Sequence, residues 1–221
     1  MTTTPGQRFR KTFARKRLED DRLEELLDIA AEIFLAEGFK GASTNTIARR
    51  ANASKATFYS RFPTKEALFL AVIEHRLEHI AGVVTPALST DAPPAIALHD
   101  FGSKLVRAAL TQEQVAFVRM IGMEAERFPK LAERFFELGP GSGQKILTAY
   151  MQQSSERGYL RMESPERMAE HFVSLVTGGE VHWFILGLRA KPGSKRLDDH
   201  IQAALQMFLL AYGNDQAKSA S

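Results

Sequence analysis

Basic and hydroxyl side chains are concentrated in one stretch of the 221-residue chain, between Gly38 and Lys65. This stretch holds six lysines and arginines and no aspartate or glutamate. Such an excess of cations favours a polyanionic partner, because each phosphate contact releases condensed counterions from a nucleic acid. The chemistry that the stretch indicates is therefore phosphate binding, and its cations are Lys40, Arg49, Arg50, Lys55, Arg61 and Lys65.

The elements expected to carry these side chains are two short helices, a tight turn between them and a third helix. Ser43 suits the N-cap of the first helix, and Asn52 suits a left-handed turn position. Ser54 suits the N-cap of the second helix, in which Phe58 points inward, and Thr64 suits the N-cap of the third. This is the pattern of a helix-turn-helix, whose second helix enters the major groove of DNA. A solvated helical hairpin with a chance basic face is the alternative, but cap, turn, aromatic and charge signals agree.

From Leu26 on, the segment LLDIAAEIFLAEGFKGASTNTIARRANASKATFYSRFPTKEAL closely resembles the DNA-binding segment of the TetR family of bacterial regulators. The resemblance includes AEGF at the end of the helix that precedes the helix-turn-helix, SK at the start of the recognition helix, and Tyr59 and Phe62. Two residues depart from the family pattern: Asn52 replaces the usual turn glycine, and Ala56 replaces a glycine near the start of the recognition helix.

The resemblance implies a set of DNA-binding residues by matching position. Lys55 and Thr57 are expected to read base edges, whereas Tyr59 and Arg61 are expected to bind phosphates. Thr44 and Lys65 lie at the starts of the first and third of these helices. There they are expected to bind a DNA phosphate together with the backbone N–H groups of the helix end. The full set is Thr44, Ser54, Lys55, Thr57, Tyr59, Arg61 and Lys65.

Charge is unevenly distributed outside this stretch. Residues 1–18 carry arginines and lysines and no acid, which is typical of a flexible basic arm. Such an arm is either solvated or in contact with phosphates, and both alternatives stay open. The absence of cysteine excludes disulfides, thiolate catalysis and cysteine-ligated zinc. The N-terminus has no apolar signal segment and no tract is long enough to span a bilayer, so we expect a cytoplasmic protein without a membrane partner.

The rest of the chain shows helical periodicity and no convincing strand, which predicts an all-α fold. We expect a first helix over 22–37, ended by Gly38, and a long helix from Lys65 to about Val84 that links two domains. Further helices are expected near 94–110, 112–127, 129–138, 143–157, 165–189 and 194–212. The predicted organisation is an arm at 1–18, a DNA-binding domain at 19–85 and a helical ligand-binding and dimerisation domain at 86–221.

Part of the second domain is similar to the C-terminal domain of AefR-like members of the same family. The similar segment is VRMIGMEAERFPKLAERFFELGPGSGQKILTAYMQQSSERGYLR. The resemblance implies a homodimer that binds a small effector in the larger domain and releases operator DNA. It also implies that the last two long helices form the dimer interface. A twofold dimer would place two recognition helices one DNA turn apart, roughly 34–36 Å, on a pseudo-palindrome.

Aromatic and methionine side chains in the larger domain indicate an adaptable apolar cavity. Each one singly is more typical of a plain core, but together they predict a small, mostly apolar effector. The predicted ligand-binding residues are Phe101, Leu105, Phe117, Met120, Met123, Phe135, Tyr150 and Trp183.

Nothing in the sequence predicts catalysis or a cofactor. There is no HExxH motif, no GxSxG elbow and no GxxxxGK phosphate loop. His75 and His79 share a helix face, but a metal site would need further ligands. We expect a transcriptional regulator, most simply a repressor, and not an enzyme. The rival interpretation is a helical small-molecule- or metal-binding protein, or an enzyme, that retains a helix-turn-helix. An activator remains an alternative within the regulators.

Overall fold

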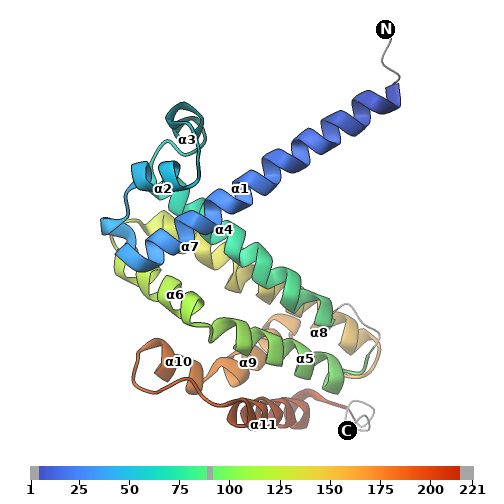
Figure 1. Ribbon diagram of the computed structural model, residues 1–221. Helices are drawn as coiled ribbons and strands as arrows, with labels where there is room; N and C mark the ends of the chain where they lie inside the picture. Colours follow the sequence, from blue (N-terminus) through green and yellow to red (C-terminus); the bar gives the residue numbers. More distant parts are fainter. Residues whose placement is uncertain (1–4, 89–91, 215–221) are drawn as a thin grey trace. The chain divides into compact units, whose positions relative to one another are not determined.

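The computed structural model describes residues 5–88 and 92–214 and confirms the all-α prediction (Figure 1). In this part of the chain the only strand-like feature is an isolated antiparallel bridge between Leu160 and Gly213. The helices are α1 (Pro5–Gly41), α2 (Thr44–Arg50), α3 (Lys55–Arg61), α4 (Lys65–Val84), the 3-10 turn η1 (Thr85–Leu88), α5 (Pro94–Ala109), α6 (Gln112–Glu124), α7 (Pro129–Leu138), α8 (Pro140–Glu156), α9 (Pro165–Thr177), α10 (Glu180–Ile185) and α11 (Ser194–Tyr212).

The chain folds into two compact units, one up to Arg76 and one from Leu77 onward. The division lies within α4, whereas the sequence suggests a boundary after residue 85. The reason is that the end of α4 is part of the second unit, since Val84 is buried in the core of that unit.

Helix α1 begins at Pro5 rather than at residue 22, so the predicted start is wrong. Residues 7–18 lack glycine and proline and are rich in arginine and lysine, which have high helix propensity. The predicted end is confirmed, because Gly38 leaves the helical conformation with φ at 71°. Beyond this kink, Phe39–Gly41 form a separate short helical segment. Only a residue without a Cβ adopts that backbone at little cost.

Aromatic rings form the core of the first unit. The Phe34 ring packs edge-on against Phe69 with their centroids 4.8 Å apart, and Phe39 lies 5.1 Å from Phe69. On α3, Phe58 packs against Phe62 at 5.7 Å. The first two contacts join α1 to α4, and the third lies between α3 and its C-cap residue. Ile47 of α2 is also buried.

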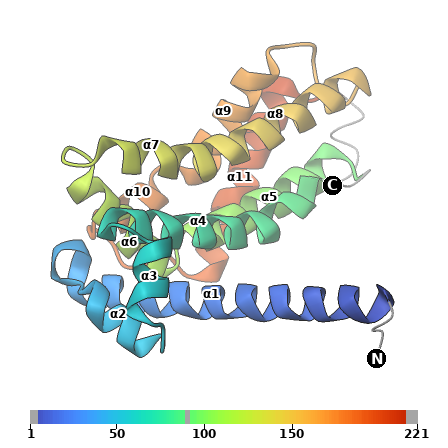
Figure 2. The ribbon, with the colours of Figure 1, turned by 90° about the horizontal axis from the view of Figure 1, so that it is seen from above.

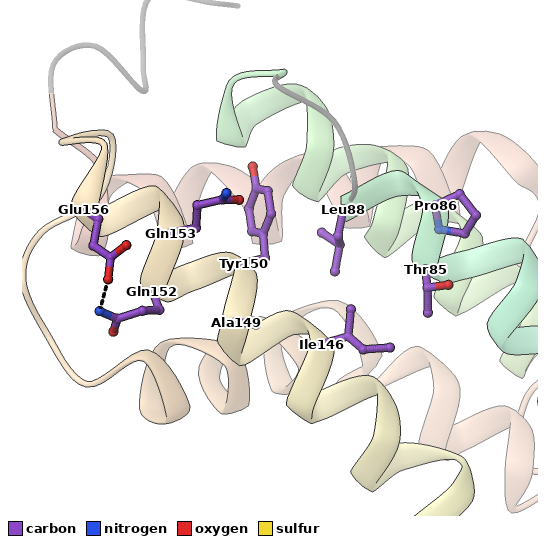
Figure 3. A pocket seen from close by; sticks show the side chains of 9 residues that line it. All are labelled: Thr85, Pro86, Leu88, Ile146, Ala149, Tyr150, Gln152, Gln153 and Glu156. Atoms are coloured by element: carbon purple, nitrogen blue, oxygen red, sulfur yellow. Dashed lines mark hydrogen bonds between the residues drawn. The ribbon is translucent and has the colours of Figure 1, made fainter.

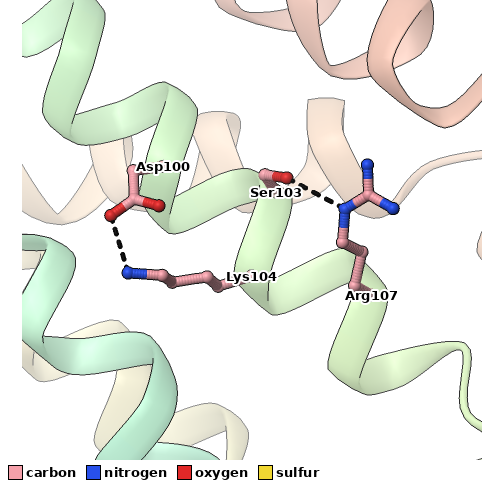
Figure 4. Close-up of polar contacts among 4 residues, drawn as sticks. All are labelled: Asp100, Ser103, Lys104 and Arg107. Carbon is pink, nitrogen blue, oxygen red and sulfur yellow. Dashed lines mark hydrogen bonds and ion pairs between the residues drawn. The ribbon is translucent and has the colours of Figure 1, made fainter. Parts of the chain in front are cut away.

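The second unit has a larger core built from α5, α8, α9 and α11 (Figure 2). Phe172 on α9 lies at its centre, with its ring 5.3 Å from Phe208 and 6.4 Å from Phe101. On the surface, Arg107 of α5 donates to Asp198 of α11 at 2.5 Å. Arg107 also donates to Ser103, beside an Asp100–Lys104 ion pair of 2.8 Å on the same helix (Figure 4).

The predicted helix over 165–189 is wrong, because the chain leaves the helix at Gly178 and Gly179. Gly179 has φ at 58°, and a Cβ on Gly178 would lie only 2.8 Å from the carbonyl oxygen of Ser174. Both positions therefore require glycine, and a short separate helix, α10, follows them. The connection between the helices predicted over 129–138 and 143–157 is shorter than expected, since Pro140 already begins α8.

Candidate nucleic-acid interface

Hydroxyl caps set the geometry of α2, the turn and α3. Ser43 Oγ accepts from the backbone N–H of Thr46 at 3.4 Å, and Ser54 Oγ accepts from that of Thr57 at 3.1 Å. Between the helices, Asn52 adopts φ of 50°, as its type predicts, and Ala53 N–H donates to the Ala48 carbonyl at 2.9 Å. The predicted helix-turn-helix is confirmed at the level of its caps and turn.

Helix α3 buries one side and displays the other. Phe58 is 1% exposed and packs inward, as predicted. The other face carries the predicted Lys55, Thr57, Tyr59 and Arg61, all exposed. A short helix anchored by one buried aromatic residue can thus present four polar or charged side chains to a duplex.

The structure brings Thr44 and Tyr59 together across α2 and α3. Their hydroxyl oxygens are 3.1 Å apart, and the Tyr59 hydroxyl also donates to the Asn45 side-chain carbonyl at 3.4 Å. These contacts orient a phenol that remains 39% exposed. Asn45 was not predicted as a partner of Tyr59. The signal in the sequence was a side-chain amide next to Thr44 in the first turn of α2.

Thr57 is oriented in a similar way within α3. Its hydroxyl lies 2.8 Å from Ser54 Oγ, so the cap residue holds the hydroxyl group. The Thr57 methyl group is then the part of the side chain best suited to contact another surface, as a thymine methyl contact requires.

Two of the basic residues have partners within the first unit. Lys65 Nζ donates to the carbonyls of Lys40 at 3.1 Å and Ala42 at 3.2 Å, and it lies over the Phe39 ring. Arg50 forms a 2.7 Å ion pair with Glu32 on α1. Lysine has three N–H donors, so Lys65 keeps one beyond these two bonds. The contacts show that Lys65 holds the start of α4 against the turn after Gly38.

The predicted effector residues are dispersed through the second unit. Phe101 and Tyr150 are buried in its core and Leu105 packs against that core. Phe117 and Met120 are buried on α6, whereas Phe135 is half-buried, Trp183 is 42% exposed and Met123 is 74% exposed.

A groove of about 780 Å³ lies between η1 and α8, and Tyr150 is the one predicted residue that lines it (Figure 3). Its lining consists of Thr85, Pro86, Leu88, Ile146, Ala149, Tyr150, Gln152, Gln153 and Glu156. Sequence reasoning missed the other eight, because only folding brings η1 beside α8.

The histidine pair on α4 forms no metal centre in the described part of the chain. His75 Nε2 lies 3.4 Å from Asp28 on α1, which is a pairwise contact. Over residues 5–88 and 92–214, no group of three or more histidine, cysteine, aspartate or glutamate side chains gathers as a metal site would require. Over the same residues, no helix has the length and apolar character needed to cross a membrane.

Comparison with known families gives two matches that together cover most of the chain. Residues 26–72 match the family described as bacterial regulatory proteins, tetR family. Residues 96–214 match the family described as AefR-like transcriptional repressor, C-terminal domain. The first match contains the helix-turn-helix and the second contains most of the core of the larger unit.

Individual proteins agree with these matches. The chain is 32% identical to the flavonoid-responsive regulator FrrA, with a TM-score of 0.74, over 89% of this chain and 99% of that one. A TetR-family regulator from Mesorhizobium loti MAFF303099 has the same fold, with a TM-score of 0.82 at 23% identity over 88% of this chain and 98% of that one. The HTH-type transcriptional regulator YvkB of Bacillus subtilis is 23% identical over 177 residues, which are 79% of this chain and 90% of YvkB. The chain therefore belongs to the TetR family of bacterial regulatory proteins and is a DNA-binding regulator of transcription.

Proposed function

We propose that the protein is a dimeric repressor that leaves a pseudo-palindromic operator when a small, mostly apolar effector binds its larger unit. The observation that carries this proposal is the face of α3, which is exposed, basic and anchored by the buried Phe58. The similarity of residues 96–214 to AefR-like repressors supports repression over activation.

On this face, base reading is assigned to Lys55 and Thr57. Lysine donates to the O6 and N7 atoms of guanine, and the threonine methyl group contacts that of thymine. Tyr59, held by Thr44, and Arg61 are assigned to phosphates, so they contribute affinity without sequence preference. Lys65 adds a phosphate contact through its remaining N–H while it keeps its two carbonyl bonds. The basic segment at 1–18 adds affinity in the same sequence-independent way.

The dimer is assigned to the C-terminal helices. On α11, Met207 is 54% exposed and Leu210 is 69% exposed, and both lie on the outer side of a helix whose other side is core. Trp183, Leu186 and Leu188 are further exposed apolar side chains, on α10 and in the loop after it. Pairing of this surface with a second copy removes it from water, and a twofold axis gives the operator its symmetry.

The effector is assigned to aromatic compounds. FrrA, which is 32% identical to this chain, is described as flavonoid-responsive, and flavonoids are planar aromatic molecules. The effector favours a conformation in which the long helix α4 moves the DNA-binding units out of register. It shifts that equilibrium only by its difference in affinity for the two states.

The test is fluorescence anisotropy of the purified protein on DNA from its own upstream region, over a series of salt concentrations. We expect tight, sequence-selective binding that is lost in the Lys55→Ala, Tyr59→Ala double variant. Lys145→Ala is the matched control, because Lys145 is an exposed lysine on α8. The rival interpretation, a binding protein or enzyme with a vestigial helix-turn-helix, predicts no selective duplex binding by any of the three proteins.

A further inference from the structure

The groove between η1 and α8 has the size of a small-molecule site. Its volume of about 780 Å³ lies within the range of roughly 300–1,000 Å³ that ligand pockets occupy. One wall is the 3-10 turn that directly follows α4, where Thr85 Oγ1 donates to the Ala81 carbonyl at 2.8 Å. An occupant of the groove would therefore touch the turn that ends α4.

The lining combines an apolar part with a polar rim. Pro86, Leu88 and Ile146 supply apolar surface that a ring system can cover. Figure 3 shows Leu88 on η1 and the Tyr150 ring and Gln153 on α8 around the same space. Burial raises the pKa of the Tyr150 hydroxyl, although a hydrogen bond with Ser154 and the charge of Arg157 lower it in part, so the phenol stays neutral.

Glu156 is the one charged residue among the nine that line the groove. The Gln152 amide donates to its Oε1 at 2.6 Å, which holds the carboxylate at the rim (Figure 3). An ionised carboxylate has about four lone-pair sites, so Glu156 can accept further bonds from a ligand. A ligand with hydroxyl donors would gain these bonds, whereas a ligand carboxylate would meet like charge at the same place.

We propose that this groove is the effector site, and that it takes a neutral planar phenol whose hydroxyls donate to Glu156 and Gln153 while its rings cover Pro86, Leu88 and Ile146. The proposal rests on the proposed function, because it assigns the effector of the regulator to a place and a chemical class. It makes Glu156 the residue that selects phenols over aromatic acids.

The experiment is isothermal titration calorimetry with three flavones: the trihydroxyflavone apigenin, unsubstituted flavone, and a flavone carboxylic acid. The full-length protein is compared with Ala149→Trp, which fills the groove from an exposed position, and with Glu156→Gln and Glu156→Lys. Ala190→Trp is the matched control, because Ala190 is exposed in the loop after α10. Circular dichroism melting establishes that each variant is folded.

We expect apigenin to bind more tightly than flavone and the acid to bind weakest. Ala149→Trp should weaken apigenin binding at least about ten-fold, which is 1.4 kcal/mol, whereas Ala190→Trp should not. Glu156→Gln should cost roughly ten-fold for apigenin, and Glu156→Lys should reverse the order of apigenin and the acid.

Two results would overturn the inference. Equal apigenin binding by Ala149→Trp and the original protein would place the effector elsewhere, and absence of apigenin binding would reject the chemical class. Neither result bears on operator binding, which the anisotropy measurement tests by itself. If the operator is bound and apigenin is not, the regulator stands and this site assignment fails.

Discussion

The recognition helix and the groove present opposite chemistry. Helix α3 displays Lys55 and Arg61 on an exposed face, in a stretch of sequence without any acid. The groove is open to solvent, has an apolar part formed by Pro86, Leu88 and Ile146, and is charged only at Glu156. An outward array of cations suits a phosphate backbone, whereas a groove with oriented acceptors suits a neutral molecule with hydroxyl donors. The contrast is the one that the proposed function requires, with DNA bound by one unit and the effector by the other.

The cores of the two units differ in a related way. The first unit is small and depends on a few rings, with Phe58 alone anchoring α3 from the inside. The second unit distributes its burial over many side chains from six helices and η1. Small units bury a smaller fraction of their surface, so each ring contributes a larger share of their stability. The DNA-binding unit should therefore be the more sensitive to a single core change.

The largest effect is expected for Phe58→Ala. Removal of a buried phenylalanine costs about 3–5 kcal/mol of unfolding free energy, because transfer and cavity terms add. Operator binding should disappear, while apigenin binding by the larger unit should persist. Urea unfolding followed by circular dichroism, together with both binding assays, measures this.

Phe136→Ala is the control, because Phe136 is 62% exposed and its removal should change stability by no more than about 0.5 kcal/mol. Loss of apigenin binding along with DNA binding would show that the two units do not respond separately.

The next effect concerns two arginines of the same stretch. Arg61→Ala should weaken operator binding roughly ten-fold and reduce the salt slope by about 1, because a charged hydrogen bond to phosphate is lost. Arg50→Ala should have a smaller effect, since its guanidinium already pairs with Glu32 at 2.7 Å. Anisotropy titrations over a salt series give both slopes. Equal losses in the two variants would mean that the Glu32 pair does not restrain Arg50.

A smaller effect is expected at the cap of α3. Ser54→Ala should cost about 1 kcal/mol of stability, because the Thr57 N–H and the Thr57 hydroxyl both lose their partner. Ser60→Ala is the matched control on the exposed face of the same helix. Chemical denaturation of both variants measures the difference. An equal change for Ser54 and Ser60 would contradict the capping role.

The smallest effect is a pH dependence that belongs to the groove. Burial raises the pKa of Tyr150 above its ordinary value of 10.0, so the folded state keeps a proton that the unfolded state releases. This contribution to stability is complete below pH 10.0 and is lost as the pH rises through the folded pKa. Tyr150→Phe should therefore flatten the fall in unfolding free energy at alkaline pH, as urea titrations on both sides of that value would reveal. An unchanged slope would mean that Tyr150 ionises freely in the folded protein.

Much of the DNA-binding unit was predictable because its signals are local. The caps at Ser43 and Ser54, the left-handed Asn52 and the inward Phe58 all follow from neighbours within four residues. The helical class of the larger unit followed from the same periodicity. The start of α1 at Pro5 was not predicted, because the run of basic residues favoured a flexible arm over the helix propensity of the same residues. The full break at Gly178 and Gly179 was not predicted either, because apolar residues on both sides of the two glycines favoured one helix over 165–189.

The sequence by itself determined the helix-turn-helix, the basic face and the family, since caps, turn conformation and charge depend on residue type and short-range spacing. Only the tertiary structure decided which side chains meet. It paired Arg50 with Glu32, directed Lys65 to the carbonyls after Gly38, and placed Thr44 against Tyr59. It also formed the groove from Leu88 and Glu156, which are far apart in the sequence. Such contacts depend on how helices pack, and packing is set by the shapes of all the buried side chains together.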